Sequence, residues 1–481
     1  MIGAVIGRKR EIEILQKKYG SNRAEFVAIY GRWRIGKTYL VSQVFENKIT
    51  FAHAGLAPVD EKGKSKKEQL KSFYLSLKLY GYQGRRMPAD WLEAFFMLEN
   101  LLMEKDDGKR LLVFIDELLW MDTRRSGFIT ALESFWNNWC CRRNNILLIV
   151  CGSATSWMLD KLIHNHEGLY NRLTCQLKLS PFCLNECEEY YRSIGVNMSR
   201  YDIVQSYMVM GGIPYYMGYL DIRMSLAQNI DALFFKKNAL LTDEYGHLFS
   251  SIFTNPEEMK RIVEFLSGKN AGYSRKEILQ GLGIKDGGEL SEKLKVLLAS
   301  DFVREYIPFG IPGKVKHYKL VDPFILFYLH FIKGQAKLGG NDWQSRQSSQ
   351  SVITWRGYAF ENVCFHHIEQ IKSGLQILGV ITEESAWSKR SDDTEGTQID
   401  LLIERKDNVV NSCEIKFDSQ EFIVDKQYYM TLLSRQNILQ EKISRKSAVH
   451  NTLIIIFGLK KNEYSSIFVN VITMDDLFKE L

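Results

Sequence analysis

Apolar runs and amphipathic segments alternate along the first part of the chain. The runs at residues 26–30, 111–115 and 146–150 are short and almost continuously apolar, which is typical of strands buried on both faces. A helix is predicted from Lys37, and another over residues 130–139, between the second and third of these strands. Strands that alternate with helices in this way predict an α/β fold with a parallel central sheet.

The middle of the chain has a different pattern. Residues 185–250 are predicted to be mostly helical, with a break at residues 211–214, which read Gly-Gly-Ile-Pro. Residues 251–322 contain two amphipathic helices, followed by a strand pair at 302–307 and 316–321. This order predicts a small mixed domain that follows a helical one.

A segment of distinct amino-acid composition precedes the last part of the chain. Residues 335–351 are rich in Gly, Ser, Gln and Asn, which predicts a linker. A helix is then expected near residues 355–371, before strands around 399–403, 409–416 and 453–457. We therefore expect a second α/β domain at the C-terminal end.

A phosphate-binding motif lies between the first predicted strand and the helix that follows it. Residues 31–38 read Gly-Arg-Trp-Arg-Ile-Gly-Lys-Thr and fit the pattern G-x-x-x-x-G-K-[ST]. Gly31 and Gly36 let backbone N–H groups curl around a phosphate, and Lys37 supplies positive charge. Thr38 can place its hydroxyl on Mg²⁺. The motif predicts ATP and Mg²⁺ as cofactors.

Polar residues end the two later strands of the same sheet. Asp116 and Glu117 follow one buried run, where Asp116 can hold the Mg²⁺ shell and Glu117 can polarise the attacking water. The alternative is an acidic pair that caps the next helix. Ser153 follows the other run and can sense the γ-phosphate, or cap a helix.

These motifs, with Gly7-Arg8 and the Gly-Gly-Ile-Pro break, resemble the archaeal-type ATPase family of the AAA+/STAND group of P-loop NTPases. The resemblance covers roughly the first half of the chain. It implies that Gly7 and Arg8 lie near the adenine and that the break belongs to a helical lid. Arg172 matches the family's basic position before the last strand, from which it could reach the γ-phosphate. A structural salt bridge is the alternative for Arg172.

The strand pair completes the order of a winged helix. Ser274 is a predicted N-cap of the first helix, residues 289–300 form the second helix, and the hairpin forms the wing. Such domains can place the second helix in the major groove of DNA. This helix carries acidic as well as basic side chains, so a protein–protein spacer remains open as the alternative.

A second group of charged residues belongs to a predicted hairpin in the C-terminal domain. Asp400 lies near the start of one strand and Glu414 near the end of the next, so a turn about Asp407 sets them directly opposite each other. Two close carboxylates repel unless a cation lies between them, and Mg²⁺ suits oxygen ligands. Lys416, on the same face as Glu414, could activate a water. Glu361, on the preceding helix, could complete the metal shell.

The motifs Gly357–Glu361, Ile399-Asp400 and Glu414-Ile415-Lys416 resemble, in this order, the PD-(D/E)XK nuclease-like domain that ends many chains of this ATPase family. The resemblance covers roughly residues 351–460. It implies a restriction-endonuclease-like α/β fold, with Asp400, Glu414 and Lys416 as catalytic residues for Mg²⁺-dependent DNA cleavage. An acidic hairpin with a cross-strand salt bridge from Lys416 is the alternative.

The patterns and motifs together divide the chain into five segments. We expect a P-loop ATPase core at 1–184, a helical lid at 185–250, a winged helix at 251–322, a linker at 323–350 and a nuclease-like domain at 351–481.

Composition adds little that is specific to a function. The net charge of +6 permits contact with nucleic acid without establishing it. The apolar runs are shorter than the ~20 residues that cross a bilayer, and the start of the chain does not read as a signal peptide. We therefore expect a cytoplasmic protein without membrane contact, with ATP and DNA as partners and a homo-oligomer as an open question.

Two functions remain open from the sequence. In the first, ATP binding or hydrolysis controls Mg²⁺-dependent DNA cleavage by the C-terminal domain. In the second, the chain is a nucleotide-dependent molecular switch or scaffold, and its C-terminal domain is not catalytic.

Overall fold

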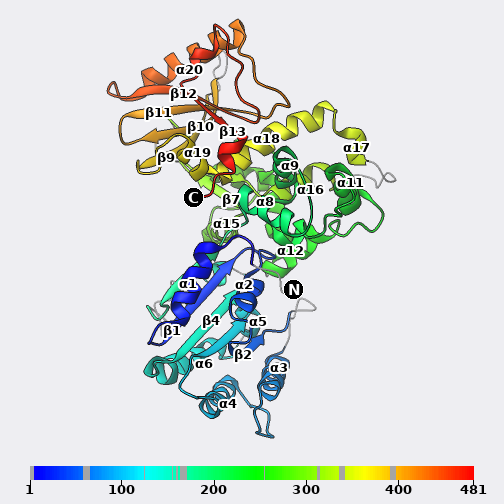
Figure 1. The fold of residues 1–481 in the computed structure, drawn as a ribbon, viewed down its shortest axis with the longest axis vertical. Coiled ribbons are helices and arrows are strands. Elements are labelled where there is room, and N and C mark those ends of the chain that lie inside the picture. The colour runs from blue at the N-terminus through cyan, green and yellow to red at the C-terminus, as the bar shows by residue number, and fades with distance from the viewer. Residues whose placement is uncertain are drawn as a thin grey trace. The chain divides into compact units, whose positions relative to one another are not determined.

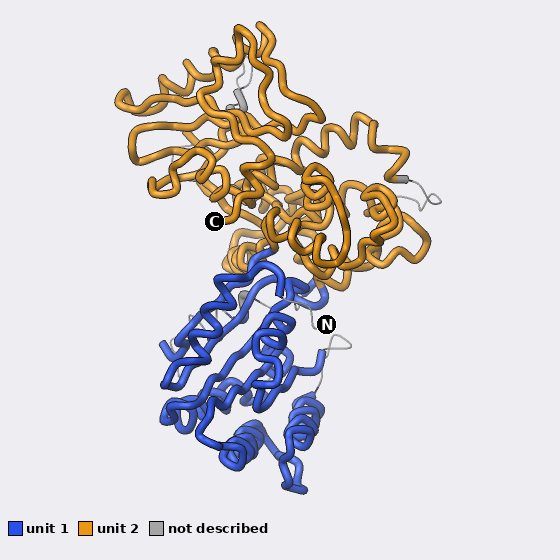
Figure 2. The backbone as a smooth tube through the Cα atoms, in the orientation of Figure 1, with its two compact units in different colours: residues 1–181, 250–256 blue, residues 182–249, 257–481 orange. Residues whose placement is uncertain are grey.

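A computed structural model describes residues 5–57, 65–123, 125–153, 155–158, 161–162, 171–253, 255–310, 315–334, 342–389 and 397–481. The chain folds as two compact units, residues 1–181 with 250–256 and residues 182–249 with 257–481 (Figure 2). The first boundary lies close to the predicted end of the ATPase core. The predicted lid, winged helix and C-terminal domain lie almost entirely within the second unit.

A parallel sheet with the strand order β2-β3-β4-β1-β5 forms the centre of the first unit (Figure 1). Its strands are β1 (Glu25–Gly31), β2 (Ile49–Ala54), β3 (Leu111–Asp116), β4 (Ile146–Gly152) and β5 (Cys175–Leu179). Every residue of β3 and β4 is buried, which confirms the prediction that these apolar runs are central strands.

Helices cover this sheet. Phe26 and Ala28 of β1 share one buried cluster with apolar side chains of α3, α4 and α6, so these helices cover the same face. The helices of the first unit are α1 (Lys9–Tyr19), α2 (Lys37–Val44), α3 (Lys66–Leu79), α4 (Trp91–Glu104), α5 (Leu118–Met121), α6 (Phe128–Ser134) and α7 (Thr155–Met158). A π-helical turn, Phe135–Trp139, continues α6.

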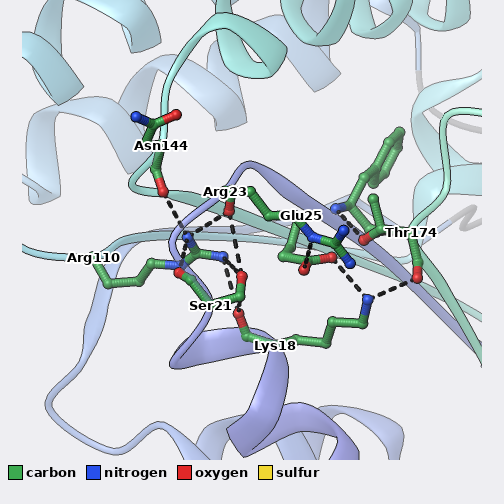
Figure 3. A network of polar contacts seen from close by, with 8 residues as sticks. Lys18, Ser21, Arg23, Glu25, Arg110, Asn144 and Thr174 are labelled. Carbon is green, nitrogen blue, oxygen red and sulfur yellow. Dashed lines mark hydrogen bonds and ion pairs between the residues drawn. The ribbon is translucent and has the colours of Figure 1, made fainter.

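A buried ionic network ties the amino end of β1 to its neighbours (Figure 3). The carboxylate of Glu25, 1% exposed, accepts hydrogen bonds from Lys18 Nζ and Arg23 Nε, each at 2.9 Å. Arg110, next to β3, donates to the backbone carbonyls of Lys18, Ser21, Arg23 and Asn144. One guanidinium therefore joins the end of α1, the turn before β1 and the segment before β4.

The second unit begins with helices, as predicted for residues 185–250. They are α8 (Leu184–Ser193), α9 (Arg200–Met210), α10 (Pro214–Met217) and α11 (Leu226–Ile230), with a π-helical turn at Asp231–Phe235. Gly211 ends α9 with a φ of +63°. A Cβ on Gly212 would clash with the Phe182 carbonyl oxygen, which explains the glycine pair at this break.

The next segment has the predicted order of helix, helix and hairpin. Its elements are α12 (Glu244–Ile252), α13 (Pro256–Leu266), β6 (Tyr273–Ser274), α14 (Arg275–Leu282), α15 (Gly288–Ala299), β7 (Val303–Tyr306) and β8 (His317–Leu320). The strands form a small antiparallel sheet in the order β6-β8-β7. Ser274 caps α14 as predicted, because its hydroxyl accepts a hydrogen bond from Glu277 N at 3.3 Å.

The predicted linker at 323–350 is wrong over its first part and over Asp342–Arg346, a helix in which Trp343 is buried. Residues Pro323–Phe331 form helix α16, which buries Phe324, Ile325 and Phe327. Asp322 caps this helix by accepting a hydrogen bond from Ile325 N at 2.8 Å. An apolar helix of this kind belongs to a core, and the composition typical of a linker begins only after it. Residues 335–341 lie outside the described residues, and α17 (Asp342–Arg346) follows them.

The C-terminal part contains the second predicted α/β layer. Its sheet has the order β13-β12-β11-β10-β9 and is mixed, with β9, β10 and β11 antiparallel and β11, β12 and β13 parallel. Its strands are β9 (Thr382–Lys389), β10 (Thr397–Arg405), β11 (Val409–Lys416), β12 (Ala448–Ile455) and β13 (Asn470–Thr473). Its helices are α18 (Gln350–His366), α19 (Ile368–Gly374), α20 (Lys426–Lys442) and α21 (Met474–Leu477).

The segment predicted as one helix near residues 355–371 is thus two helices, α18 and α19. Within the described ranges, none of the helices combines the length and the apolar character that crossing a membrane requires.

We predict that Glu25→Gln destabilises the first unit by about 3 kcal/mol, because it leaves the Lys18 ammonium without its buried carboxylate. Burial raises the pKa of Glu25, but hydrogen bonds from Thr174, Lys18 and Arg23 outweigh it and lower the pKa to about 2. The stabilisation is therefore complete at neutral pH and is lost as the pH falls from about 4.5 toward 2. Urea unfolding at pH 7 and pH 3 measures both effects.

The exposed Glu46 provides the matched control, since Glu46→Gln should leave the unfolding curve unchanged. A loss for Glu25→Gln no larger than the ~0.5 kcal/mol of a surface ion pair would contradict a structural role for the network.

Candidate functional site

The phosphate-binding loop connects β1 to α2 at the carboxyl edge of the first sheet. Gly31 ends β1 with a φ of +144°, and a Cβ there would clash with the Leu179 carbonyl oxygen of β5. Gly36 precedes α2 with a φ of +88°. Both glycines of the motif therefore stand where a side chain is excluded or strained. The predicted loop and helix start are confirmed.

Lys37, the lysine of the loop, is 5% exposed. Its ammonium donates hydrogen bonds to the backbone carbonyls of Gly31, at 3.1 Å, and Arg32, at 3.0 Å. Burial lowers the pKa of Lys37, although the nearby carboxyls of Glu117 and Asp116 act in the opposite direction. The loop thus holds a desolvated positive charge at the place where a nucleotide phosphate would lie.

Thr38 and Asp116 meet across the sheet edge. Thr38 Oγ1 donates a hydrogen bond to Asp116 Oδ2 at 2.5 Å. Asp116 ends β3 and is 5% exposed. A hydroxyl and a carboxylate are ligand types that Mg²⁺ accepts, and these two would bind one ion once the hydrogen bond between them is broken. The role of Thr38 and Asp116 as metal ligands stays a prediction.

Glu117 and Ser153 also face each other. Ser153 donates to Glu117 Oε2 through its hydroxyl, at 2.7 Å, and through its backbone N–H, at 3.3 Å. Burial raises the pKa of Glu117; Lys37 lowers it, the neighbouring Asp116 raises it, and the Ser153 hydrogen bonds lower it. Glu117 has a left-handed φ of +49°, and its side chain makes no capping bond to α5 among the described contacts. The alternative of a helix cap is not observed.

The segment before α1 reaches the same edge of the sheet. Arg8 is 6% exposed, and its guanidinium donates to the Ser180 carbonyl at 2.6 Å. Ser180 follows Leu179, which pairs with Gly31 of the loop. Gly7, with a φ of +63°, makes the turn that precedes Arg8. The contact with adenine implied by the resemblance stays a prediction for both residues.

The prediction that Arg172 reaches the γ-phosphate is wrong. Cys175, at the start of β5, pairs with Val27 near the amino end of β1, whereas the phosphate loop follows the carboxyl end of β1. Thr174 confirms this placement, because its backbone N–H donates to the Phe26 carbonyl at 2.8 Å. Arg172 precedes both residues and is exposed. All strands of a parallel sheet have their amino ends on one side and their carboxyl ends on the other. Arg172 therefore lies on the side of the amino ends, opposite the phosphate loop.

Comparison with known proteins agrees with this site. Residues 6–220 match a family model described as an ATPase domain predominantly from Archaea. Residues 6–220 form an archaeal-type ATPase domain. The domain spans the phosphate loop, Asp116, Glu117 and Ser153, and it continues to the helical segment around the Gly-Gly-Ile-Pro break.

Two proteins of Methanocaldococcus jannaschii are similar to the chain. An uncharacterized protein is 24% identical over 400 residues, which are 82% of this chain and 83% of that protein. An uncharacterized ATP-binding protein is 44% identical over 43 residues, 9% of this chain and 73% of that protein.

Among solved structures, the chain aligns with a Walker-type ATPase of Pyrococcus abyssi, with a TM-score of 0.48 and 17% identity over 68% of this chain and 96% of that chain. The Aeropyrum pernix ORC2 protein has a TM-score of 0.43 and 16% identity over 67% of this chain and 92% of that chain.

The acidic hairpin of the second unit has the predicted register. Leu401 of β10 pairs with Cys413 of β11, which sets Asp400 opposite Glu414 at the end of the ladder. Asp400 Oδ2 accepts a hydrogen bond from Ile415 N at 3.2 Å. Lys416 Nζ lies 3.5 Å from Glu414 Oε2 on the same strand, so this contact is not the cross-strand salt bridge expected as the alternative.

The predicted metal cluster of Glu361, Asp400 and Glu414 is not formed. Over the residues that the structure describes, no group of three or more His, Cys, Asp or Glu side chains is arranged to hold a metal ion. Glu414 instead accepts hydrogen bonds from Tyr428 Oη and Arg435 Nη1, each at 2.6 Å. Glu361 accepts one from Asn270 Nδ2 at 2.6 Å and lies 3.7 Å from Lys319 Nζ.

Protein cations and donors thus surround Glu414 and Glu361. The sequence argument missed these partners because they come from other elements. Arg435 and Tyr428 both lie on α20, seven positions apart and therefore on one face of the helix, which is a signal that helical periodicity could have revealed. Lys319 comes from β8, far away in sequence, and no local pattern identifies it.

We predict that Asp400→Asn stabilises the second unit at pH 8. Burial, then repulsion from Glu361 and Glu414, raises the pKa of Asp400 from 3.8 to about 7. Between pH 3.8 and about 7, the folded chain therefore holds a proton on Asp400 that the unfolded chain has released. The free energy of unfolding falls as the pH rises through this range. The full shift corresponds to an upper bound of about 4 kcal/mol at pH 8. Denaturant unfolding at pH 5 and pH 8 measures this dependence.

The exposed Asp418 serves as the control, because Asp418→Asn removes a nearby carboxylate that lies in solvent. If Asp400→Asn and wild type lose the same stability between pH 5 and pH 8, Asp400 is ionised at little cost in the folded chain.

Proposed function

We propose that the chain is a Mg²⁺-dependent ATPase, with the catalytic centre at the carboxyl edge of the first sheet. The observation that carries this proposal is the contact between Thr38 and Asp116 beside the buried Lys37. Lys37 would bind the β- and γ-phosphates, while Thr38 and Asp116 would hold the metal. The bound Mg²⁺ supplies charge neutralisation for the phosphates.

Glu117 is the proposed general base for the attacking water. Its raised pKa favours proton uptake, and its side chain lies next to the metal ligand Asp116. Ser153 holds the Glu117 carboxylate through two hydrogen bonds. We therefore assign Ser153 as a positioning residue that orients the Glu117 carboxylate. Through this contact, Ser153 would sense the γ-phosphate when Glu117 moves.

The role of the second unit is proposed to be that of a nucleotide-dependent switch. The contacts around the helix–helix–hairpin segment, proposed as a winged helix, favour this role over reading of DNA. Lys293 of α15 lies 2.7 Å from Glu258 and 2.6 Å from Glu289, and Lys316 lies 2.8 Å from Glu305. Lysines that already pair with carboxylates offer less charge to phosphates than free ones do.

Mg²⁺-dependent DNA cleavage remains the second candidate because of one observation, the register that sets Asp400 opposite Glu414 with Lys416 beside them. The cations that contact Glu414 and Glu361 weigh against it. We propose that cleavage, where it occurs, requires these contacts to open.

We predict that Lys37→Ala abolishes measurable ATP binding and hydrolysis. Glu117→Gln should keep ATP binding and lower kcat about 100-fold or more, because a general base is lost while the metal ligands stay. Release of phosphate from ATP, with nucleotide binding measured separately by fluorescence, checks both. Lys67→Ala, at an exposed position of α3, is the control and should behave as wild type. Full hydrolysis by Glu117→Gln would remove Glu117 from the mechanism.

A DNA assay decides between the two roles of the second unit. We expect supercoiled, single-stranded and branched DNA to remain intact with wild type, Mg²⁺ and ATP. In a separate experiment, we expect partial proteolysis of the protein to give different fragments with ADP and with ATP. DNA nicking by wild type that disappears in Asp400→Asn would instead establish the nuclease and contradict the switch.

A further inference from the structure

A cavity in the second unit lies outside the proposed ATPase centre and has a volume of about 320 Å³. Its lining includes Arg304 of β7, Lys319 of β8, Ser385 of β9 and Asp400 of β10. Small-molecule sites in proteins span ~300–1,000 Å³, so the cavity can take a compact ligand. All of these residues belong to the same compact unit.

Two cations face this cavity from one side. Arg304 pairs with Lys319 in the antiparallel ladder of β7 and β8, so both side chains project from the same face of the hairpin. Both also pack on Phe365: the Arg304 guanidinium carbon lies 5.2 Å and Lys319 Nζ lies 4.8 Å from the centre of the ring. The ring thereby holds two positive groups close to each other.

These cations have donor hydrogens to spare. Among the described residues, Arg304 makes one hydrogen bond, from Nη1 to the Phe365 carbonyl at 3.3 Å, although a guanidinium has five N–H groups. Its carboxylate partner Glu384 is 4.0 Å away. Lys319, which is 6% exposed, forms an ion pair with Glu361 at 3.7 Å, and its ammonium makes no shorter contact with a carboxylate among the described residues. Burial lowers the pKa of both groups.

A third donor is independent of these charges. Ser385 is 7% exposed, lines the cavity, and its hydroxyl has no hydrogen-bond partner in the part of the chain that the structure describes. A buried hydroxyl without a partner costs free energy, which a ligand oxygen in the cavity would recover.

The acidic residues around the cavity are engaged elsewhere. Glu384 lies 2.7 Å from Lys372, and Glu277 lies 3.0 Å from Lys269. Glu361 accepts a hydrogen bond from Asn270 at 2.6 Å. Asp400 accepts a hydrogen bond from Ile415 N at 3.2 Å. The Arg304 charge is therefore the least compensated one at the cavity.

We propose that this cavity binds a phosphate group, either free phosphate or a phosphate monoester, through Arg304, Lys319 and Ser385. A guanidinium, an ammonium and a hydroxyl can each bond a different oxygen of a tetrahedral oxyanion. This site goes beyond the proposed ATPase activity and does not depend on it, because it lies on a different compact unit.

The test uses the full chain with a non-hydrolysable ATP analogue and Mg²⁺ at saturation, so that the phosphate loop is filled. Inorganic phosphate, AMP, and oligonucleotides with a 5′-phosphate or a 5′-hydroxyl are titrated in turn by calorimetry. We expect phosphate-dependent binding that weakens about tenfold or more in Arg304→Gln and in Lys319→Met, and severalfold in Ser385→Ala. Lys316→Met is the matched control, because this exposed lysine of the same hairpin pairs with Glu305.

Ser385→Ala keeps the test decisive if the charge variants unfold, since it removes only the unpartnered hydroxyl. Preference for the 5′-phosphate over the 5′-hydroxyl oligonucleotide would identify a strand end as the source, and equal binding of inorganic phosphate and AMP would identify a small phosphate compound. Absence of phosphate-dependent binding in wild type, or unchanged binding in both Arg304→Gln and Ser385→Ala, would overturn the proposal. Loss of ATP hydrolysis in Lys37→Ala would have no bearing on it.

Discussion

The carboxyl edge of the first sheet depends on the buried ammonium of Lys37. A desolvated positive charge is costly unless nearby groups stabilise it, and here two loop carbonyls accept its hydrogen bonds while Asp116 and Glu117 lie close enough to act on its pKa. Asp116 is in turn held by Thr38, and Glu117 by Ser153. The loop, the proposed metal ligands and the proposed base thus form one connected arrangement of charged groups.

Two glycines make this arrangement possible. Gly31 allows the loop to leave β1 directly beside the Leu179 carbonyl of β5, and Gly36 turns the chain into α2. The same edge receives Arg8 through its hydrogen bond to Ser180. At the opposite edge, Glu25 and Arg110 fix the amino ends of the strands. Ion pairs of Glu25 therefore stabilise the sheet at the amino ends of its strands, while the charged Lys37 lies at the carboxyl ends, where a nucleotide would bind.

The parts of the fold that sequence reasoning predicted correctly are local in sequence. The phosphate loop lies within eight consecutive residues, and the pairing of Asp400 with Glu414 follows from one short turn. Failures came where distant segments decide the outcome. The position of Arg172 depends on how β5 aligns with β1, and the apolar side chains of α16 become a core helix only when other helices cover them.

The charged partners of the acidic hairpin were missed for the same reason. Strand periodicity indicates which carboxylates face each other, but it does not indicate what neutralises them. Arg435 and Tyr428 reach Glu414 from α20, and Lys319 approaches Glu361 from β8. Repulsion between close carboxylates was correctly expected, because Glu361 and Glu414 raise the pKa of Asp400, and protein cations contact Glu414 and Glu361.

The two acidic centres of the chain, at Asp116 and at Glu414, differ in the hydrogen bonds that a metal ion would have to displace. A divalent ion that binds at Asp116 has to displace one hydroxyl hydrogen bond, from Thr38, and Thr38 can then serve as a second ligand. An ion at Glu414 has to displace the Arg435 guanidinium and the Tyr428 hydroxyl, and Lys416 opposes it. Breaking a buried charged hydrogen bond costs roughly 2 kcal/mol or more for each contact. Nucleotide chemistry in the first unit therefore needs little rearrangement, whereas metal chemistry at the hairpin would first require the Arg435 and Tyr428 side chains to leave Glu414.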